Sequence, residues 1–384
     1  MPNSETARNW QIPFVNFAAQ FAEERDEILA IVETVFARGD FIGGLEVGLL
    51  EQELAAYLGV PHVVALNSGT DALVLAMAAL GIRPGDEVIT PPNSFVASTA
   101  AIAHLGAVPV WVDVGDDLNI DPSLIEAAIT PRTKAIMPVH LTGRMCDMDA
   151  IIRLASARGL KVIEDAAQAI GSEFDGRKAG AIGDAGCFST HPLKNLNAAG
   201  DGGFVALRDG AVADRIRTMR NHGLRDRNTV EAFGFVSRMD TLQAAILRHR
   251  LRRLPGVIER RRANAQTYRR VLDPRHVAIP ECRDREFNTF HLFVIETSDR
   301  DALKAHLESI GIGTSIHYPV PIHRQQAATR YRTAPGGYPV AERQARTMLS
   351  LPVNQSLGEA EITRVAQAIN AFHAERAVRA GSAR

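Results

Sequence analysis

Between about residues 46 and 165, the chain alternates segments with a helical spacing of apolar residues and short apolar runs. Residues 46–59 form the first such helix pattern, which Gly59 would end, and residues 62–66 follow as a buried strand. The alternation continues through the segments that we predict as helices or strands at 70–80, 87–90, 94–106, 108–113, 123–129, 134–140, 161–165, 184–190 and 203–207. Such alternation is typical of βαβ units, so we expect an α/β fold with a mostly parallel central sheet flanked by helices.

Past residue 237 the pattern changes to long helical segments. Residues 237–254 and 257–272 are predicted as two helices that Pro255 and Gly256 separate, because proline breaks a helix interior. A strand pattern returns only at 290–297. This order of elements is typical of a helix that leads into a smaller α+β domain.

The length of 384 residues exceeds what one core usually serves. We therefore predict two domains, a large one over 12–250 and a smaller α+β domain over 251–384. The short tail after residue 373 is rich in Ala and Arg, and we expect it to fray.

The charges are balanced, with 43 basic and 44 acidic residues and a formal net charge of −1. No overall field therefore draws the chain to nucleic acid or to an anionic membrane, and we expect neither as a partner. Locally, residues 248–270 contain nine arginines against one acid, Glu259. This run is either a solvated helix face with some contact to a partner subunit or a site for phosphate or nucleic acid.

Three cysteines, Cys146, Cys187 and Cys282, lie far apart and form no C-x-x-C pair. This usage fits a reducing compartment and buried thiols, and it predicts neither a disulfide framework nor a metal site. Residues 1–11 are polar, and no apolar run approaches the length of a membrane span. We expect a cytoplasmic protein.

Two segments place polar groups where a parallel sheet could bind a ligand. Residues 67–70, Asn-Ser-Gly-Thr, follow a strand and open a helix, where backbone N–H groups can bind a phosphate, although a plain N-cap is the commoner use. Residues 161–171 end a strand with Glu164 and Asp165, at the edge where open α/β folds bind ligands. A carboxylate at a strand end also often serves only as a turn former.

A third segment, residues 187–203, holds Lys194 in a loop rich in Gly and Asn. Lysine is scarce here, with five against 38 arginines, so a loop lysine is less expected as ordinary surface charge. The P-loop pattern is absent, since Asn195 follows the lysine. A partly desolvated amine instead becomes nucleophilic toward carbonyls. A phosphate site, a carboxylate and an amine together fit pyridoxal 5'-phosphate.

Six segments support this interpretation as a set. The chain resembles the sugar aminotransferases of the DegT/StrS type, which are fold type I pyridoxal-phosphate enzymes, in NSGTDAL, EDAAQA, FSTHPLKNLNAAGDGG, RNHG, SRMDTLQAAIL and IHYPVPIH. The similarity runs in order over about residues 12–370. It implies that Lys194 bonds covalently to the cofactor and later moves the proton between substrate and cofactor carbons. It also implies that Asp165 pairs with the pyridine nitrogen.

The resemblance assigns the remaining cofactor contacts in the same way. Gln168 matches the group beside the phenolic oxygen of the cofactor, and Phe95 matches the aromatic residue that stacks on the ring. Gly69, Thr70 and Ser189 match the phosphate ligands. Without the resemblance, Phe95 would be taken as a core residue.

One position departs from the family pattern. These enzymes usually have Gly-Tyr-Asn-Ser-Arg before the interdomain helix, with the Asn reaching the cofactor phosphate of the other subunit, whereas residues 234–238 are Gly-Phe-Val-Ser-Arg. Val236 cannot donate that hydrogen bond. Either Asn221 or Asn228 takes its place, or the site does without the contact.

The resemblance implies a homodimeric aminotransferase that moves an amino group from an amino acid, with glutamate as the expected donor, to a keto-sugar that is attached to a nucleotide. Tyr318 and His323 fall in the substrate-side loop of the family, although a Pro-rich loop also packs well for structural reasons. An aminocyclitol acceptor is the main alternative. Related sugar dehydratases carry a histidine where this chain has Lys194, and a cofactor-binding regulator without catalysis is the alternative of a different class.

Overall fold

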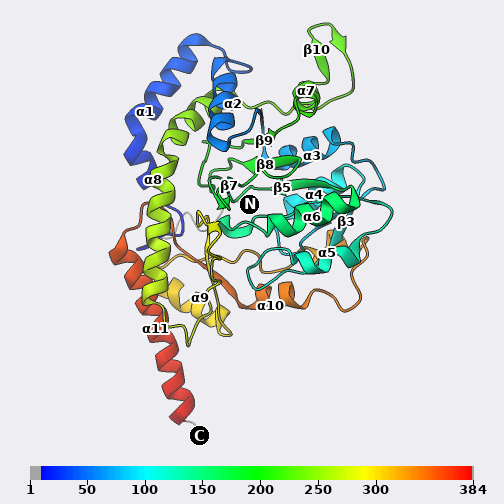
Figure 1. Ribbon diagram of the computed structural model, residues 1–384. Coiled ribbons are helices and arrows are strands. Elements are labelled where there is room, and N and C mark those ends of the chain that lie inside the picture. The colour runs from blue at the N-terminus through cyan, green and yellow to red at the C-terminus, as the bar shows by residue number, and fades with distance from the viewer. Residues whose placement is uncertain (1–9, 383–384) are drawn as a thin grey trace.

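The computed structural model describes residues 10–382, so most of the polar amino-terminal stretch lies outside the described residues (Figure 1). A seven-stranded sheet forms its centre, in the order β1-β9-β8-β5-β4-β2-β3. Six strands run in one direction and β9 runs against them. The strands are β1 (His62–Leu66), β2 (Glu87–Thr90), β3 (Val108–Trp111), β4 (Thr133–Ile136), β5 (Lys161–Asp165), β8 (Ala185–Ser189) and β9 (Gly203–Leu207). The predicted α/β class with a mostly parallel sheet is confirmed.

Helices cover both faces of this sheet (Figure 1). Side chains alternate between faces along a strand, so Val64 and Leu66 of β1 pack on one side and Val63 and Ala65 on the other. The first side is covered by α3 (Gly69–Ala79), α4 (Val96–His104) and α7 (Gly210–Met219). The second is covered by α2 (Leu45–Leu58), α5 (Pro122–Ala128), α6 (Met148–Arg158) and the first half of α8 (Thr241–Val271).

A separate core forms in the carboxyl-terminal part, around Tyr268, Phe293 and Ile362. Its elements are β13 (Phe293–Glu296), β14 (Met348–Leu351), α9 (Arg300–Ser309), α11 (Glu359–Ser382) and the second half of α8. The remaining elements are α1 (Phe17–Arg38), η2 (Leu141–Gly143), β6 (Glu173–Phe174), β7 (Arg177–Lys178), β10 (Leu224–Asp226), β11 (Thr229–Val230), β12 (Glu286–Phe287), η3 (Ile322–Arg324), η4 (Gln326–Ala328) and α10 (Pro339–Thr347). The domain boundary at 250/251 stays a prediction, and α8 crosses it without a break.

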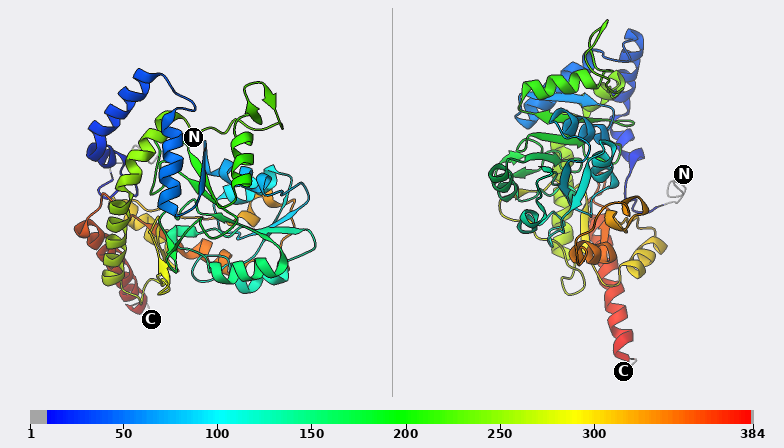
Figure 2. Two further views of the ribbon diagram at one scale, coloured as in Figure 1. Left: turned by 45° about the horizontal axis from the view of Figure 1, so that its top comes forward. Right: turned by 90° about the vertical axis from the view of Figure 1, so that its right-hand side faces the viewer.

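Two expectations about the helices of the carboxyl-terminal part are wrong. The expected break at Pro255 is wrong, because α8 is one helix of 31 residues with this proline inside it. Proline removes one helical hydrogen bond, but contacts with α1, α2 and α11 hold both halves of α8 in line. The expected fraying after residue 373 is also wrong for the described residues. There α11 continues to Ser382, and its end extends away from the body of the molecule (Figure 2).

The arginines of residues 248–270 are mostly used within the chain. Arg248, Arg250, Arg253, Arg260 and Arg270 form ion pairs with acids of α1, α2 and α11. Three more donate hydrogen bonds to backbone carbonyls: Arg261, Arg262 and Arg269. The basic run therefore holds α8 against its neighbours, and it does not present a free surface for phosphates.

The three cysteines were expected to be free thiols, and no helix was expected to span a membrane. Cys146 and Cys187 are buried, Cys282 is half-buried, and all three are free. Within residues 10–382, none of the helices combines the length and the apolar character that crossing a bilayer requires.

Candidate active site

The carboxyl ends of β1, β2, β5 and β8 meet at one edge of the sheet, as expected for neighbouring parallel strands. Lys194 lies at this edge, in the connection between β8 and β9, where its backbone N–H donates to the carbonyl of His191 over 2.8 Å. Its side chain is half-buried, and its amine makes no hydrogen bond or ion pair with any residue that the structure describes. Burial lowers the pKa of Lys194 to about 8, although the charge of Asp165 acts in the opposite direction. The amine is therefore easier to deprotonate than an ordinary lysine.

Asp165 is the last residue of β5 and is 5% exposed. Its Oδ2 accepts a hydrogen bond from Ser98 Oγ over 2.7 Å, and its Oδ1 accepts one from the Ala167 N–H over 3.2 Å. Burial raises the pKa of Asp165, against the hydrogen bond from Ser98 and the charge of Lys194. Within residues 10–382 this carboxylate has no ion-pair partner. A buried carboxylate in that position favours a ligand that brings a positive charge.

The neighbouring Glu164 belongs to a different arrangement. Its Oε2 lies 2.9 Å from His140 Nε2, and its Oε1 accepts from the Gly183 N–H. His140 Nδ1 accepts from the Cys146 N–H, so His140 carries its proton on Nε2 and donates it to Glu164. Glu164 thus accepts hydrogen bonds from the backbone of residues 180–183 and stabilises that turn. Of the two carboxylates at the end of β5, only Asp165 belongs to the candidate site.

A chain of contacts runs from Gln168 to Phe95. Gln168 Oε1 accepts from the Thr142 N–H over 2.7 Å, and Gln168 Nε2 lies 3.4 Å from the Tyr318 hydroxyl. The rings of Tyr318 and Phe95 are 5.7 Å apart between centroids and tilted by 44°. Phe95 immediately precedes α4 and is 54% exposed, which rules out a simple core role. Ser98, which donates to Asp165, lies in the first turn of α4. The start of this helix therefore places the Phe95 ring and the Ser98 hydroxyl close together.

Gly69, Thr70 and Ser189 gather where α3 begins. Ser68 caps this helix, since its Oγ accepts from the Asp71 N–H over 3.0 Å. A Cβ added to Gly69 would lie 2.6 Å from Ser189 Cβ, so only glycine allows the end of β8 this close to the helix. The first N–H groups of a helix have no intrahelical acceptor, so together with the Ser189 hydroxyl they offer donors that an anion could use.

The amine, the buried carboxylate and the anion site are thus assembled at one edge of the sheet. A family model described as the DegT/DnrJ/EryC1/StrS aminotransferase family matches residues 22–370. The chain belongs to this aminotransferase family. The aminotransferase activity that the sequence predicted is confirmed at this level.

Curated relatives span almost the same length. The chain is 44% identical over 363 residues to a UDP-N-acetyl-3-dehydro-alpha-D-glucosamine 3-aminotransferase of Acidithiobacillus ferrooxidans, covering 94% of this chain and 98% of that protein. It is 42% identical over 368 residues to a dTDP-3-amino-3,4,6-trideoxy-alpha-D-glucose transaminase of Streptomyces venezuelae, covering 95% of this chain and 97% of that protein.

Solved structures share the fold of this aminotransferase. The crystal structure of DesV from S. venezuelae in complex with a ketimine intermediate matches with a TM-score of 0.92 and 42% identity, over 94% of this chain and 98% of that chain. The structure of NtdA from Bacillus subtilis with bound cofactor PMP matches with a TM-score of 0.88 and 33% identity, over 96% of this chain and 86% of that chain.

Two predicted site residues of this aminotransferase lie apart from the others. His323 is buried in η3, where its Nε2 lies 3.0 Å from Glu342 Oε1, so this nitrogen is already engaged. Asn221 pairs with Val236 in an isolated bridge, and its Oδ1 accepts from Arg238 over 3.2 Å. Within residues 10–382, no hydrogen bond joins either residue to the group around Lys194 and Asp165.

The site also contains residues that the sequence did not single out. Besides Ser98 and Thr142, these are His291 and His317, both of which have a pKa lowered by burial and by the charge of Lys194. The pKa of His317 falls to about 4, so this histidine is neutral, and its Nδ1 lies 2.9 Å from Ser350 Oγ. His317 lies in a segment that already carried the family resemblance, whereas His291 sits in an apolar run with no signal of its own.

Proposed function

We propose that this aminotransferase uses pyridoxal 5'-phosphate to move an amino group from an amino acid, with glutamate as the expected donor, to a nucleotide-linked keto-sugar. The observation that carries the proposal is that a desolvated amine, Lys194, and a buried carboxylate, Asp165, lie at the same edge of the sheet, and that within residues 10–382 neither side chain forms an ion pair. Relatives named for UDP-linked and dTDP-linked sugars, and a related structure with bound PMP, support the substrate class and the cofactor.

The residues present fit this cofactor at each of its polar groups. Asp165 would hold the pyridine nitrogen, because a buried carboxylate stabilises a protonated ring. Backbone N–H groups at Gly69 and Thr70 and the Ser189 hydroxyl would hold the phosphate. Bound pyridoxal phosphate supplies an aldehyde that an amine can attack and a ring that accepts electrons from the substrate carbon.

Phe95 and Gln168 would contact the cofactor ring and its phenolic oxygen. Phe95 offers an exposed aromatic face for stacking, which its position before α4 and its 54% exposure support. Gln168 would lie beside the phenolic oxygen. Tyr318, within 3.4 Å of Gln168 Nε2, would line the substrate side, and we propose the same for His323 only if Glu342 releases it.

Lys194 performs the proton chemistry in this proposal. With a pKa of about 8, about one tenth of the amine is unprotonated at pH 7, far more than for an ordinary lysine. The unprotonated Nζ is a nucleophile toward carbonyl carbons. Once free, the same Nζ would take the proton from the substrate carbon and deliver it to the cofactor carbon, as a base that becomes an acid. Burial favours the neutral amine and so keeps it available as a base.

We propose a homodimer whose partner covers the anion end of the site. The Phe41 carbonyl accepts from the Thr241 N–H and Ile42 pairs with Asp240, which brings an apolar segment beside Val236. Ile42 and Val236 line a hollow of about 640 Å³ that reaches Ser68, the cap of α3. The segments 36–45 and 233–236, to which Ile42 and Val236 belong, carry further exposed apolar side chains: Phe36, Phe41, Leu45, Phe233 and Phe235. A second copy would bury these apolar side chains. Asn221 or Asn228 of that copy would supply the hydrogen bond that the family's Asn makes at the position of Val236.

A monomeric preparation with full activity would contradict the dimer.

Three free thiols support a reducing compartment, so we propose the cytoplasm as the place of action. The regulator alternative loses its main support, because the arginines of 248–270 are engaged within the chain. A sugar dehydratase stays disfavoured by the presence of Lys194.

The proposed reaction is tested by two half-reactions on the purified holoenzyme. Glutamate should convert the absorbance of the aldehyde form of the cofactor to that of the amine form, and a nucleotide-linked 3-keto or 4-keto sugar should restore the aldehyde form. Recovery with a keto-inositol alone would instead establish the aminocyclitol alternative. If no amino acid converts the cofactor, the proposed reaction is wrong.

A further inference from the structure

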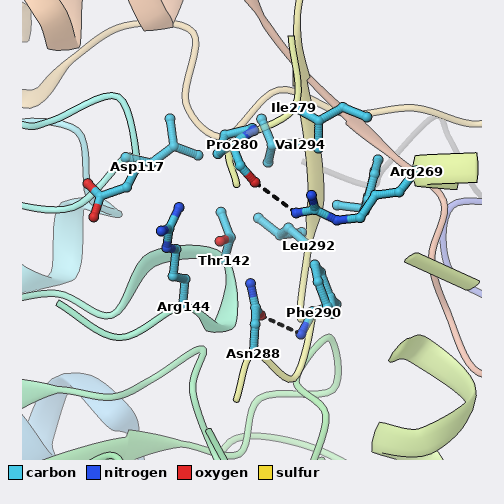
Figure 3. A pocket seen from close by; sticks show the side chains of 12 residues that line it. Asp117, Thr142, Arg144, Arg269, Ile279, Pro280, Asn288, Phe290, Leu292 and Val294 are labelled. Atoms are coloured by element: carbon cyan, nitrogen blue, oxygen red, sulfur yellow. Dashed lines mark hydrogen bonds between the residues drawn. The ribbon is translucent and has the colours of Figure 1, made fainter. Parts of the chain in front are cut away.

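Thr142 adopts a backbone conformation that is unfavourable for its residue type. It lies in η2 with φ of 65° and ψ of 0°, in the left-handed region that β-branched residues rarely enter. Its side chain is buried and lines a narrow cavity of about 20 Å³ beside Arg144 and Leu292 (Figure 3). Within residues 10–382 its hydroxyl makes no hydrogen bond, so the side chain offers no polar compensation for the strain.

The backbone groups of Thr142 explain what this conformation achieves. The Thr142 N–H donates to Gln168 Oε1 over 2.7 Å, and the Thr142 carbonyl accepts from the Leu292 N–H over 3.1 Å, just before β13. The next carbonyl, of Gly143, accepts from Ser172 Oγ over 2.6 Å. Contacts on both sides therefore hold the left-handed turn in place, which is the condition under which such strain persists.

The contact with Thr142 settles how the Gln168 side chain is oriented. A backbone N–H can only donate, so the atom 2.7 Å from it must be the amide oxygen of Gln168. The amide nitrogen then faces Tyr318, whose hydroxyl lies 3.4 Å away. Gln168 is buried, and a flipped amide would bring two N–H donors together at Thr142. The side chain is thus locked as a hydrogen-bond donor on the side of Tyr318 and the candidate site.

We propose that Thr142 is a positioning residue that acts through Gln168. Its strained turn directs one backbone N–H onto the Gln168 amide oxygen, so that the amide nitrogen is presented as a donor to the phenolic oxygen of the cofactor. This inference rests on the proposed function, because it needs the cofactor beside Gln168. The inference also links β13 to the cofactor. The Leu292 N–H, just before β13, donates to the Thr142 carbonyl, and the Thr142 N–H holds Gln168, which would stabilise the charge on the phenolic oxygen.

A donor at the phenolic oxygen has a measurable effect. It stabilises negative charge there, and its loss leaves the oxygen better able to retain a neighbouring proton. The pH at which the bound cofactor changes its absorbance should therefore rise when the donor is lost. A purely structural contact between η2 and Gln168 would change stability and leave this pH unchanged.

The experiment removes the donor in two independent ways in the holoenzyme. Gln168→Leu deletes the amide, and an α-hydroxy acid in place of Thr142, introduced by nonsense suppression, deletes the N–H and also weakens the Leu141 carbonyl, which accepts from the Arg144 N–H. The matched control is the same backbone replacement at Gly143, which leaves the Thr142 N–H in place. The absorbance of the bound cofactor is titrated against pH at saturating cofactor, and the dissociation constant of the cofactor is measured alongside.

We expect both changes to raise the midpoint of the titration by about half a unit, and to weaken cofactor binding about five-fold, as for the loss of one hydrogen bond. The double variant should shift no further than Gln168→Leu alone, since both changes act through one amide. The Gly143 replacement should leave the midpoint at the wild-type value.

An unchanged midpoint for the Thr142 replacement would overturn the inference, whether or not Gln168→Leu shifts it. Full additivity in the double variant would overturn it too. Failure of the proposed function would give a different result. The wild-type protein would then bind no cofactor at Lys194, and there would be no cofactor absorbance to titrate.

Discussion

The buried amine of Lys194 should destabilise the cofactor-free protein at neutral pH. Its pKa falls from 10.5 to about 8 on folding, chiefly through burial. Between these two values the unfolded chain binds more protons than the folded one, so the free energy of unfolding rises with pH across this window. Below pH 8 the amine is charged in both states and the full penalty applies, whereas above pH 10.5 it is neutral in both states and the penalty vanishes.

The size of this penalty follows from the shift of 10.5 − 8 = 2.5 units. At about 1.36 kcal/mol for each unit, the upper bound is about 3.4 kcal/mol. The side chain is only half-buried, and water screens part of the effect, so about 1–2 kcal/mol is the expected value. Lys194→Met keeps the length of the side chain and removes its charge, and it should therefore stabilise the apoprotein by that amount at pH 7.

Urea unfolding of the cofactor-free proteins measures this difference directly. The variant should be the more stable protein at pH 7, and the difference should fall to about 0.4 kcal/mol at pH 10.5, where the unfolded amine is half protonated. Lys134→Met is the matched control, because Lys134 is exposed on β4 and its replacement should have the same small effect at both pH values. A Lys194→Met protein that is less stable at pH 7, or a difference that does not depend on pH, would refute the reasoning.

Three further predictions concern the surroundings of the site. Ser98→Ala removes the 2.7 Å hydrogen bond to Asp165 and should weaken cofactor binding about five-fold in an absorbance titration; unchanged affinity would exclude a role for this hydroxyl. Phe95→Ala should change the free energy of unfolding of the apoprotein by less than about 0.5 kcal/mol, since the ring is 54% exposed, yet weaken cofactor binding; the opposite pattern would make Phe95 a core residue. Glu24→Ala removes a carboxylate that is 2% exposed and pairs with Arg250, and it should lower the free energy of unfolding by about 3 kcal/mol in urea, whereas a loss below about 1 kcal/mol would show the pair to be solvated.

The strands and helices around the sheet were predictable because their signals are local. A helix such as α2 carries apolar residues at helical spacing and ends at Gly59, whose φ of 72° favours glycine. The strand β1 was likewise expected at residues 62–66. The continuity of α8 through Pro255 was not predictable in this way, because it depends on contacts with α1, α2 and α11 that are distant in sequence.

The same limit applies to the site. Lys194 and Asp165 stand in segments with recognisable patterns, and the structure brings both to one edge of the sheet. Their supporting contacts join residues that no periodicity relates. Ser98 and Asp165 are 67 positions apart, and Gln168 and Tyr318 are 150 positions apart. Such pairs are defined by the packed fold.

The central claim is that Lys194 is the covalent attachment point of the cofactor. Borohydride reduction of the holoenzyme, followed by proteolysis and mass spectrometry of the peptides, tests it most directly. The account predicts a single peptide that carries the reduced cofactor on Lys194, and no such adduct in Lys194→Ala. A reducible adduct on another lysine, or one that persists in Lys194→Ala, would contradict the account.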